Sequence, residues 1–237
     1  MRWEFTPDEF IYVWGQLGAD RIPAPLSLTA SVRWRDEWEA IDRNLRERLQ
    51  VIEDPDLLPV LRTAADPDIS LMLVGSRNRK LRAFGAVTTN IGVTIVQRAG
   101  AGPDFGGNVV IEVGSAALVP KVFAAVAGEH PPGQTAGMVE TFERLQDTRT
   151  PIGLIPDEPV VADRMRSLLA APRSGHGHIE VQCDRHASNP PSPRYLSWFD
   201  VDGDGRYIYL RRHRDFHIDP CSTEGFRSAV SRLMGRS

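Results

Sequence analysis

Apolar residues follow two periods along the chain, and segments with the helical period precede segments with the strand period. Near the N-terminus the spacing is helical, with apolar positions at Phe10, Val13, Trp14 and Leu17. Thr6 can cap this helix, Pro7 fits its first position, and Glu9 can reach back to the amide of Thr6. Helices are therefore predicted over residues 7–17, 35–50 and 55–65.

The pattern then changes to short runs of β-branched and apolar residues separated by links that contain glycine and asparagine. The strands predicted from these runs are 69–74, 81–88, 92–97 and 109–113. Short links between consecutive strands favour antiparallel pairing, because parallel pairs need long crossover connections. A helix is predicted near residues 120–126, before Gly128.

A loop rich in proline and glycine, residues 129–137, precedes a second block with the same order of elements. Helices are predicted over 138–145 and 157–169, strands over 178–183, 195–199 and 207–211, and a last helix from Asp219 or Ser222. Each half therefore consists of helices, an antiparallel meander and one more helix, which is the composition of an α+β protein. The approximate halves 1–128 and 138–237 suggest an internal structural duplication, and an α+β protein with coincidental symmetry is the alternative.

Composition is that of an ordinary soluble domain of 237 residues with a net charge of −3. No run of Lys or Arg is dense enough to follow a phosphate backbone, so a nucleic acid is not an expected partner. The N-terminus lacks the organisation of a signal peptide, and no apolar run is long enough for a membrane span. The two cysteines, Cys183 and Cys221, cannot form a disulfide framework. A cytoplasmic protein is therefore expected.

An aspartate-rich segment resembles the first half of a calcium-binding loop. Asp200, Asp202 and Asp204 are followed by Gly205, as in the first six positions of an EF-hand loop. The twelfth position should carry a bidentate glutamate, and it is Arg211, while the flanking segments are predicted strands. A tight hairpin turn is therefore predicted, with weak cation binding as the alternative.

Histidines and cysteines gather in the second half of the chain. His176 and His178 alternate on one face of a predicted strand, and the others are Cys183, His186, His213, His217 and Cys221. Zinc would require three or four of them to converge, and none has a recognised ligand spacing. No metal site and no cofactor is therefore predicted.

Signals for catalysis are also weak. The glycine-rich stretch 100–107 is not followed by a Gly-Lys-Ser or Gly-Lys-Thr sequence, so it is predicted to connect two strands. No serine lies in a Gly-x-Ser-x-Gly turn. No catalytic residue is assigned, and the chain is not expected to be an enzyme.

An apolar face is predicted for the second helical region. Its members are Met138, Phe142, Leu145, Met165, Leu168 and Leu169. Such a stripe is ordinarily part of the core, and the alternative is a groove for a partner helix, for which flexible methionine is well suited.

The chain resembles the EspG family in segments that follow one another in order through nearly the whole sequence. These segments span residues 21–26, 57–62, 69–73, 81–87, 173–179, 195–200 and 205–207. The similarity is clearest near the C-terminus, where Gly175-His176-Gly177-His178 precedes Trp198-Phe199-Asp200 and then Gly205-Arg206-Tyr207.

The resemblance implies one α+β domain over residues 1–237, with a quasi-two-fold central antiparallel sheet flanked by helices. It also implies a cytosolic, non-enzymatic chaperone of PE–PPE heterodimers in type VII secretion. Such a protein is a monomer or a homodimer, and it covers the hydrophobic tip of the PPE protein to keep the pair soluble. By resemblance, the contact surface would come from the sheet, from residues 75–80 and from the helices within 138–169. The partner-binding residues expected there are Arg77, Arg79, Met138, Phe142, Leu145, Met165, Leu168 and Leu169. The alternative is a small-molecule or metal-binding protein, or an enzyme with its site in the histidine-rich half.

Overall fold

The computed structural model describes residues 1–19, 21–49, 54–102, 106–147 and 160–235. In the first half the elements are β1 (Arg2–Phe5), α1 (Pro7–Gly15), α2 (Arg35–Arg48), α3 (Leu57–Ala65), β2 (Ile69–Ser76), β3 (Lys80–Thr88), β4 (Ile91–Ala99), β5 (Gly106–Ser115) and α4 (Leu118–Ala127). In the second half they are β6 (Met138–Thr141), α5 (Phe142–Gln146), α6 (Val161–Ala170), β7 (Arg173–Gln182), β8 (Arg194–Val201), β9 (Arg206–Arg212), β10 (Asp215–Pro220) and α7 (Thr223–Leu233).

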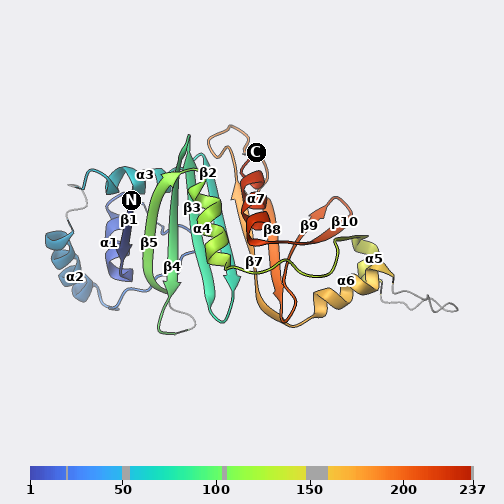
Figure 1. The fold of residues 1–237 in the computed structure, drawn as a ribbon. Helices are drawn as coiled ribbons and strands as arrows, with labels where there is room; N and C mark the ends of the chain where they lie inside the picture. Colours follow the sequence, from blue (N-terminus) through green and yellow to red (C-terminus); the bar gives the residue numbers. More distant parts are fainter. Residues whose placement is uncertain (20, 50–53, 103–105, 148–159, 236–237) are drawn as a thin grey trace.

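The strands form one ten-stranded sheet in the order β1-β5-β4-β3-β2-β7-β8-β9-β10-β6 (Figure 1). Strands β2 and β7 meet antiparallel at its centre, with Leu73 opposite Ile179. Outward from this pair the order is the same on both sides, since β3, β4, β5 and β1 correspond to β8, β9, β10 and β6. The predicted α+β fold with a central antiparallel sheet is thus confirmed.

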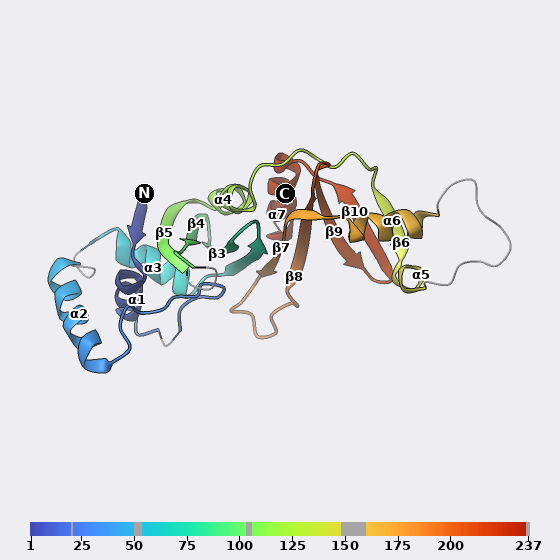
Figure 2. The ribbon, with the colours of Figure 1, turned by 90° about the horizontal axis from the view of Figure 1, so that it is seen from below.

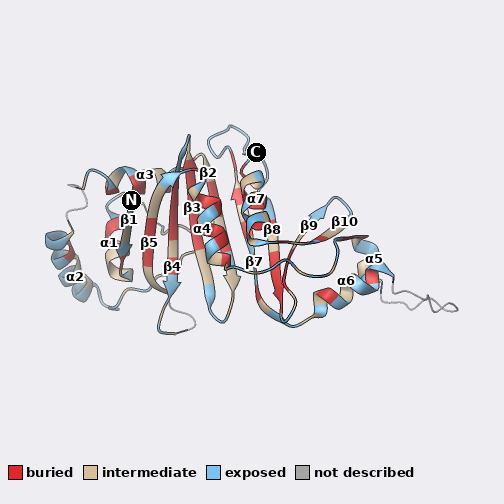
Figure 3. Cartoon of the chain, viewed as in Figure 1, coloured by how far each residue is buried: buried red, intermediate tan, exposed pale blue. Residues whose placement is uncertain are grey.

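Helices α4 and α7 lie side by side on one face of the sheet (Figures 1 and 2). Phe123 from α4 and Phe226 from α7 are fully buried there against the inward side chains of the central strands. These strand residues include Leu71, Leu73, Ile179, Val181 and Trp198. Among the described residues, the apolar cluster with the most buried members therefore lies between the sheet and this helix pair (Figure 3).

The opposite face of the sheet carries two separate cores. At one end α1 and α3 bury residues such as Phe10 and Leu61 against β3, β4 and β5. At the other end α6 buries Met165 and Leu168 against β8, β9 and β10. Because the two cores are separate, the central strands lie between them on this face.

Helix starts follow the capping signals in the sequence. The hydroxyl of Thr6 accepts a hydrogen bond from the amide of Glu9 (3.3 Å), and the Glu9 carboxylate accepts one from the amide of Thr6 (2.8 Å). Ser222 accepts a hydrogen bond from the amide of Gly225, so the last helix begins after Ser222 and not at Asp219.

The prediction of a helix over 138–145 is wrong in its first half. Met138 to Thr141 form the edge strand β6, and Met138 lies opposite Ile218 of β10. The β-branched Val139 and Thr141 favour this extended backbone, and Thr141 then caps the short helix α5. Helix α6 begins at Val161, and residues 157–159 of the predicted helix lie outside the described part of the chain.

Two further strands, the edge strand β1 and the strand β10 beside the other edge, are missing from the predicted set. Strand β1 pairs with β5, placing Trp3 opposite Ile111. Strand β10 returns from β9 through a turn at His213, which has a positive φ of 54°. No helix of the described residues is long and apolar enough to cross a bilayer.

Candidate functional site

On the face opposite α4 and α7, no helix of the described residues covers the centre of the sheet (Figure 2). We name this surface the open strip, and its residues are Met72, Val74, Ser76, His176, His178, Glu180, Tyr195 and Ser197. Val74 is 37% exposed and Tyr195 is 54% exposed, although both are large apolar side chains on strands. The strip therefore presents apolar area that the described part of the chain leaves uncovered.

Strand register places these side chains in rows across the sheet. Val74 lies opposite His178, which lies opposite Ser197. Met72 lies in the next row with Glu180 and Tyr195. Since directly opposite residues in antiparallel strands share a face, the apolar and polar side chains of the strip are close neighbours.

Histidines and glycines alternate along β7, so the histidines lie on the open strip and the glycines on the inner face of the sheet. On the inner face Gly75 and Gly177 lie beneath the fully buried indole of Trp198, and a Cβ added to Gly177 would come 2.3 Å from that ring. Only glycine fits at this close approach. The alternation of Gly175, His176, Gly177 and His178 thus keeps the strand flat against Trp198 and leaves both imidazoles exposed on the strip.

The tip between β2 and β3 is held by a buried carboxylate. Arg77 donates to Oδ2 of Asp200 (2.6 Å), and Arg206 donates to both carboxylate oxygens of Asp200 (2.7 and 3.0 Å). Arg206 also donates to the carbonyl oxygen of Ala127 at the end of α4 (2.8 Å). The hairpin tip, the β8–β9 hairpin and α4 therefore meet at Asp200.

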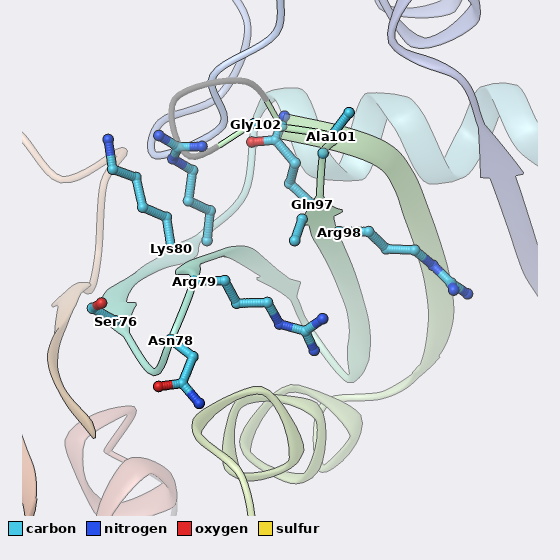
Figure 4. A pocket seen from close by; sticks show the side chains of 12 residues that line it. Ser76, Asn78, Arg79, Lys80, Gln97, Arg98, Ala101 and Gly102 are labelled. Atoms are coloured by element: carbon cyan, nitrogen blue, oxygen red, sulfur yellow. The ribbon is translucent and has the colours of Figure 1, made fainter. Parts of the chain in front are cut away.

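The expected partner-binding residues Arg77 and Arg79 have different surroundings. The side chain of Arg77 is 29% exposed and pairs within the chain with Asp200. Arg79 is exposed and lines a cavity of about 470 Å³ at this end of the sheet (Figure 4).

The apolar residues expected to bind a partner lie around α5 and α6. Met138, Met165 and Leu168 are buried in the core with Phe199 and Tyr207, and Leu145 and Leu169 pack against that core. Phe142 is 37% exposed, with the guanidinium of Arg211 4.9 Å from its ring. Of the two interpretations of this stripe, the structure gives core packing to every member except Phe142.

The aspartate-rich segment forms the predicted hairpin turn. Gly203 has a φ of +73°, which glycine adopts at no steric cost. Oδ2 of Asp204 accepts a hydrogen bond from the hydroxyl of Tyr207 (2.6 Å), and its Oδ1 accepts one from the amide of Gln134 (2.7 Å). Since Asp200 is paired with arginines, the three carboxylates do not form a shared ligand set.

The histidines and cysteines of the second half do not converge. His186 lies 3.7 Å from a carboxylate oxygen of Asp66, beyond the ends of the central strands β2 and β7, while His176 and His178 lie on the open strip. Within the described residues, no three His, Cys, Asp or Glu side chains are placed to hold a metal ion.

Both thiols are buried and free. Burial raises the pKa of Cys221 to about 11, against the weaker opposing effect of Arg206, and burial also raises the pKa of Cys183. A thiol is a nucleophile only as the thiolate, so these shifts disfavour nucleophilic chemistry at either residue near neutral pH.

Strand alternation predicts that both histidines of the strip share one face, but it does not predict the rest of the strip. The signal in the sequence is the alternation of glycine with histidine at 175–178, and the structure adds the exposed Tyr195 on the neighbouring strand.

The fold is similar to that of a solved chaperone. The chain matches the structure of the Mycobacterium tuberculosis type VII secretion system chaperone EspG5 in complex with the PE25–PPE41 dimer, with a TM-score of 0.65 and 13% sequence identity. The match covers 98% of this chain and 95% of the other. A search of curated protein sequences gives no match.

The sequence also matches a family model over almost its whole length. The matched residues, 6–232, extend from the cap of α1 to the last turn of α7. The chain therefore belongs to the EspG family.

Proposed function

We propose that this protein is a cytoplasmic chaperone of PE–PPE protein pairs in type VII secretion, and that the open strip receives the PPE protein. Membership of the EspG family supports the role, as does the likeness to a chaperone that was solved with a PE–PPE dimer. That likeness extends over nearly all of both chains, so the whole architecture is shared. The observation that carries the proposed surface is the exposed apolar area at the centre of the sheet.

The chemistry of the strip suits a partner that must later be released. Val74 and Tyr195 supply exposed apolar area at its centre beside the half-buried Met72, and His176 and Ser76 supply polar groups toward the hairpin tip. Specific interfaces combine a desolvated apolar centre with a polar rim, and a few central side chains contribute most of the affinity. An apolar centre of this limited extent favours binding that the export machinery can reverse.

The strip is also a rigid surface. Its strands pair on both sides, and beneath it the buried indole of Trp198 packs edge-on against Phe226 of α7, with ring centroids 5.3 Å apart. A preformed surface loses little conformational entropy when a partner binds. The proposed role requires no catalytic group, and we assign none.

Co-expression with a PE–PPE pair encoded by the same organism tests this function. Size-exclusion chromatography should show a stoichiometric complex of the three proteins. Val74→Asp and Tyr195→Asp each place a charge in the centre of the strip, and each should weaken the complex by about tenfold or more. Ile91→Asp is the matched control, because Ile91 is another exposed apolar strand residue, 50% exposed and outside the strip.

Two results would count against the proposal. If each native PE–PPE pair is soluble alone and elutes apart from this protein, the chaperone role is wrong. If Val74→Asp and Ile91→Asp bind equally well, the role stands but the strip is not the docking surface.

A further inference from the structure

Positive charge gathers at one end of the sheet although the chain as a whole is negative, with a net charge of −3. Between residues 69 and 102 there is no Asp or Glu, and the cations are Arg77, Arg79, Lys80, Arg82 and Arg98. Strands β3 and β4 bring the last four of these around the cavity of about 470 Å³ (Figure 4). Local charge therefore opposes the charge of the whole molecule.

The cations divide between the two faces of the sheet. Arg82 lies opposite Val74, so its side chain shares the face of the open strip, and Lys80 lies opposite Ser76 on that face. Figure 4 shows Arg79 and Arg98 extending the other way, toward the side on which α4 lies. The open strip is thus continuous with a basic flank formed by Arg82 and Lys80.

The cations at this end of the sheet differ in the ion pairs that they form within the chain. Arg77 is neutralised by Asp200, and Arg98 pairs with Glu4 at 3.1 Å. Among the described residues, no carboxylate lies within ion-pair distance of Arg82 or Arg79. The guanidinium of Arg82 is therefore available to a carboxylate from outside the chain, and guanidinium binds carboxylate in a bidentate geometry.

We propose that the basic flank, Arg82 with Lys80, binds an acidic segment of the PPE partner, next to the apolar segment that docks on the open strip. This inference rests on the proposed function and adds the charge of the client. A client that covers Val74 lies beside Arg82, because the two residues are cross-strand neighbours. Carboxylates at that position pair with Arg82, whereas a client with cations there is repelled.

A nucleic acid fits this surface less well. Binding to a phosphate backbone uses a track of many cations, and single-stranded binding adds aromatic side chains on which bases stack. Among the described residues that line the cavity, none is aromatic. The geometry therefore favours a short acidic protein segment.

The test compares equal charge changes on the two faces, using the PE–PPE pair that co-elutes with the wild-type protein. Dissociation constants are measured for wild type, Arg82→Glu and Arg98→Glu at low and high salt. Arg82→Glu should raise the dissociation constant by about tenfold at low salt and less at high salt. Arg98→Glu should change it by less than about twofold, because Arg98 is on the opposite face and already paired. Arg82→Lys should recover part of the lost affinity.

Thermal unfolding of each variant excludes loss of the fold as the cause. If Arg82→Glu does not fold, Lys80→Glu at the exposed strand end takes its place, with the same expected direction. Equal effects of Arg82→Glu and Arg98→Glu would overturn the inference, because net charge alone would then explain them. Displacement of the client by short single-stranded DNA in an Arg82-dependent manner would overturn it as well. Binding of the wild-type protein distinguishes the two proposals. If wild type binds the PE–PPE pair, the proposed function stands even where the inference fails. If wild type does not bind, both the function and the inference are rejected.

Discussion

Asp200 and Arg206 form a fully buried ion pair within one hairpin, joined by two hydrogen bonds of 2.7 and 3.0 Å. Both side chains have no exposed area. The guanidinium also lies over the ring of Phe226, with Cζ 5.1 Å from the ring centroid. Because Arg77 reaches the same carboxylate from the β2–β3 tip, this pair joins the two halves of the sheet.

Removing the carboxylate should be strongly destabilising. Asp200→Asn leaves Arg206 as a buried charge without a counterion, and the expected loss is about 3–5 kcal/mol in the free energy of unfolding. Urea unfolding followed by far-UV circular dichroism measures it. Arg227→Gln is the control, because Arg227 and Glu224 form an exposed pair on α7 whose loss should cost about 0.5 kcal/mol or less. An equal loss for the two variants would show that the buried pair does not stabilise the fold.

The strands and most helices could be predicted because their signals are local. The runs 69–74 and 81–88 are apolar and β-branched, and the structure extends each by a few residues only. The helical spacing of Met138, Phe142 and Leu145 predicts one helix over 138–145, and this prediction is wrong for residues 138–141. The pairing partner that makes Met138 extended is β10, nearly eighty residues away, and that pairing is not visible in local periodicity.

The candidate surface can be predicted only in part, because it too depends on contacts between residues that are far apart in the sequence. Alternation predicts that His176 and His178 share a face, and the structure places both on the open strip. Whether a helix covers that face depends on where α1, α3 and α6 pack, which is a tertiary property. The pairing of Arg77 with Asp200 spans 123 residues, so no local pattern predicts an intramolecular role for Arg77.

Gly177→Ala should destabilise the protein although alanine is a small residue. Its Cβ would lie 2.3 Å from the Trp198 ring and 2.5 Å from the carbonyl oxygen of Val74, which belongs to the neighbouring strand. Such overpacking costs about 1–3 kcal/mol, measurable by urea unfolding. Gly15→Ala is the opposite control, because nothing lies within 4 Å of the added Cβ in α1, and a gain of about 0.5–1 kcal/mol is expected. Stabilisation by Gly177→Ala would disprove the close approach.

Calcium should not stabilise the β8–β9 turn. Asp200 is occupied by two arginines, and both oxygens of Asp204 accept hydrogen bonds from within the chain. The expected result is an unchanged melting temperature when millimolar calcium replaces a chelator in the same buffer. A rise in melting temperature that Asp202→Asn abolishes would contradict this and restore the cation-binding interpretation.

Phe142→Asp tests which of two regions binds the partner, the open strip or the apolar residues around α5 and α6. Phe142 is the exposed member of the apolar group near α5, at the end of the sheet that carries β6. If the client occupies the open strip alone, Phe142→Asp should leave its dissociation constant within about twofold, whereas Val74→Asp raises it by about tenfold or more. If Phe142→Asp is the more damaging variant, the docking surface lies at α5 and α6.

Stability should fall as the pH rises from about 9 toward 11, partly because of Cys221. Burial raises the pKa of this thiol from 9.0 to about 11, so the folded state retains its proton after the unfolded state has lost it. In this pH range the unfolded state binds fewer protons than the folded state, so the free energy of unfolding decreases as the pH rises. Below pH 9 the thiol is protonated in both states, so it does not change the free energy of unfolding. Urea unfolding of wild type and Cys221→Ala at a series of pH values isolates the contribution. The stability difference between the two proteins should narrow as pH rises through that range, and a constant difference would show that the buried thiol does not contribute to the pH dependence.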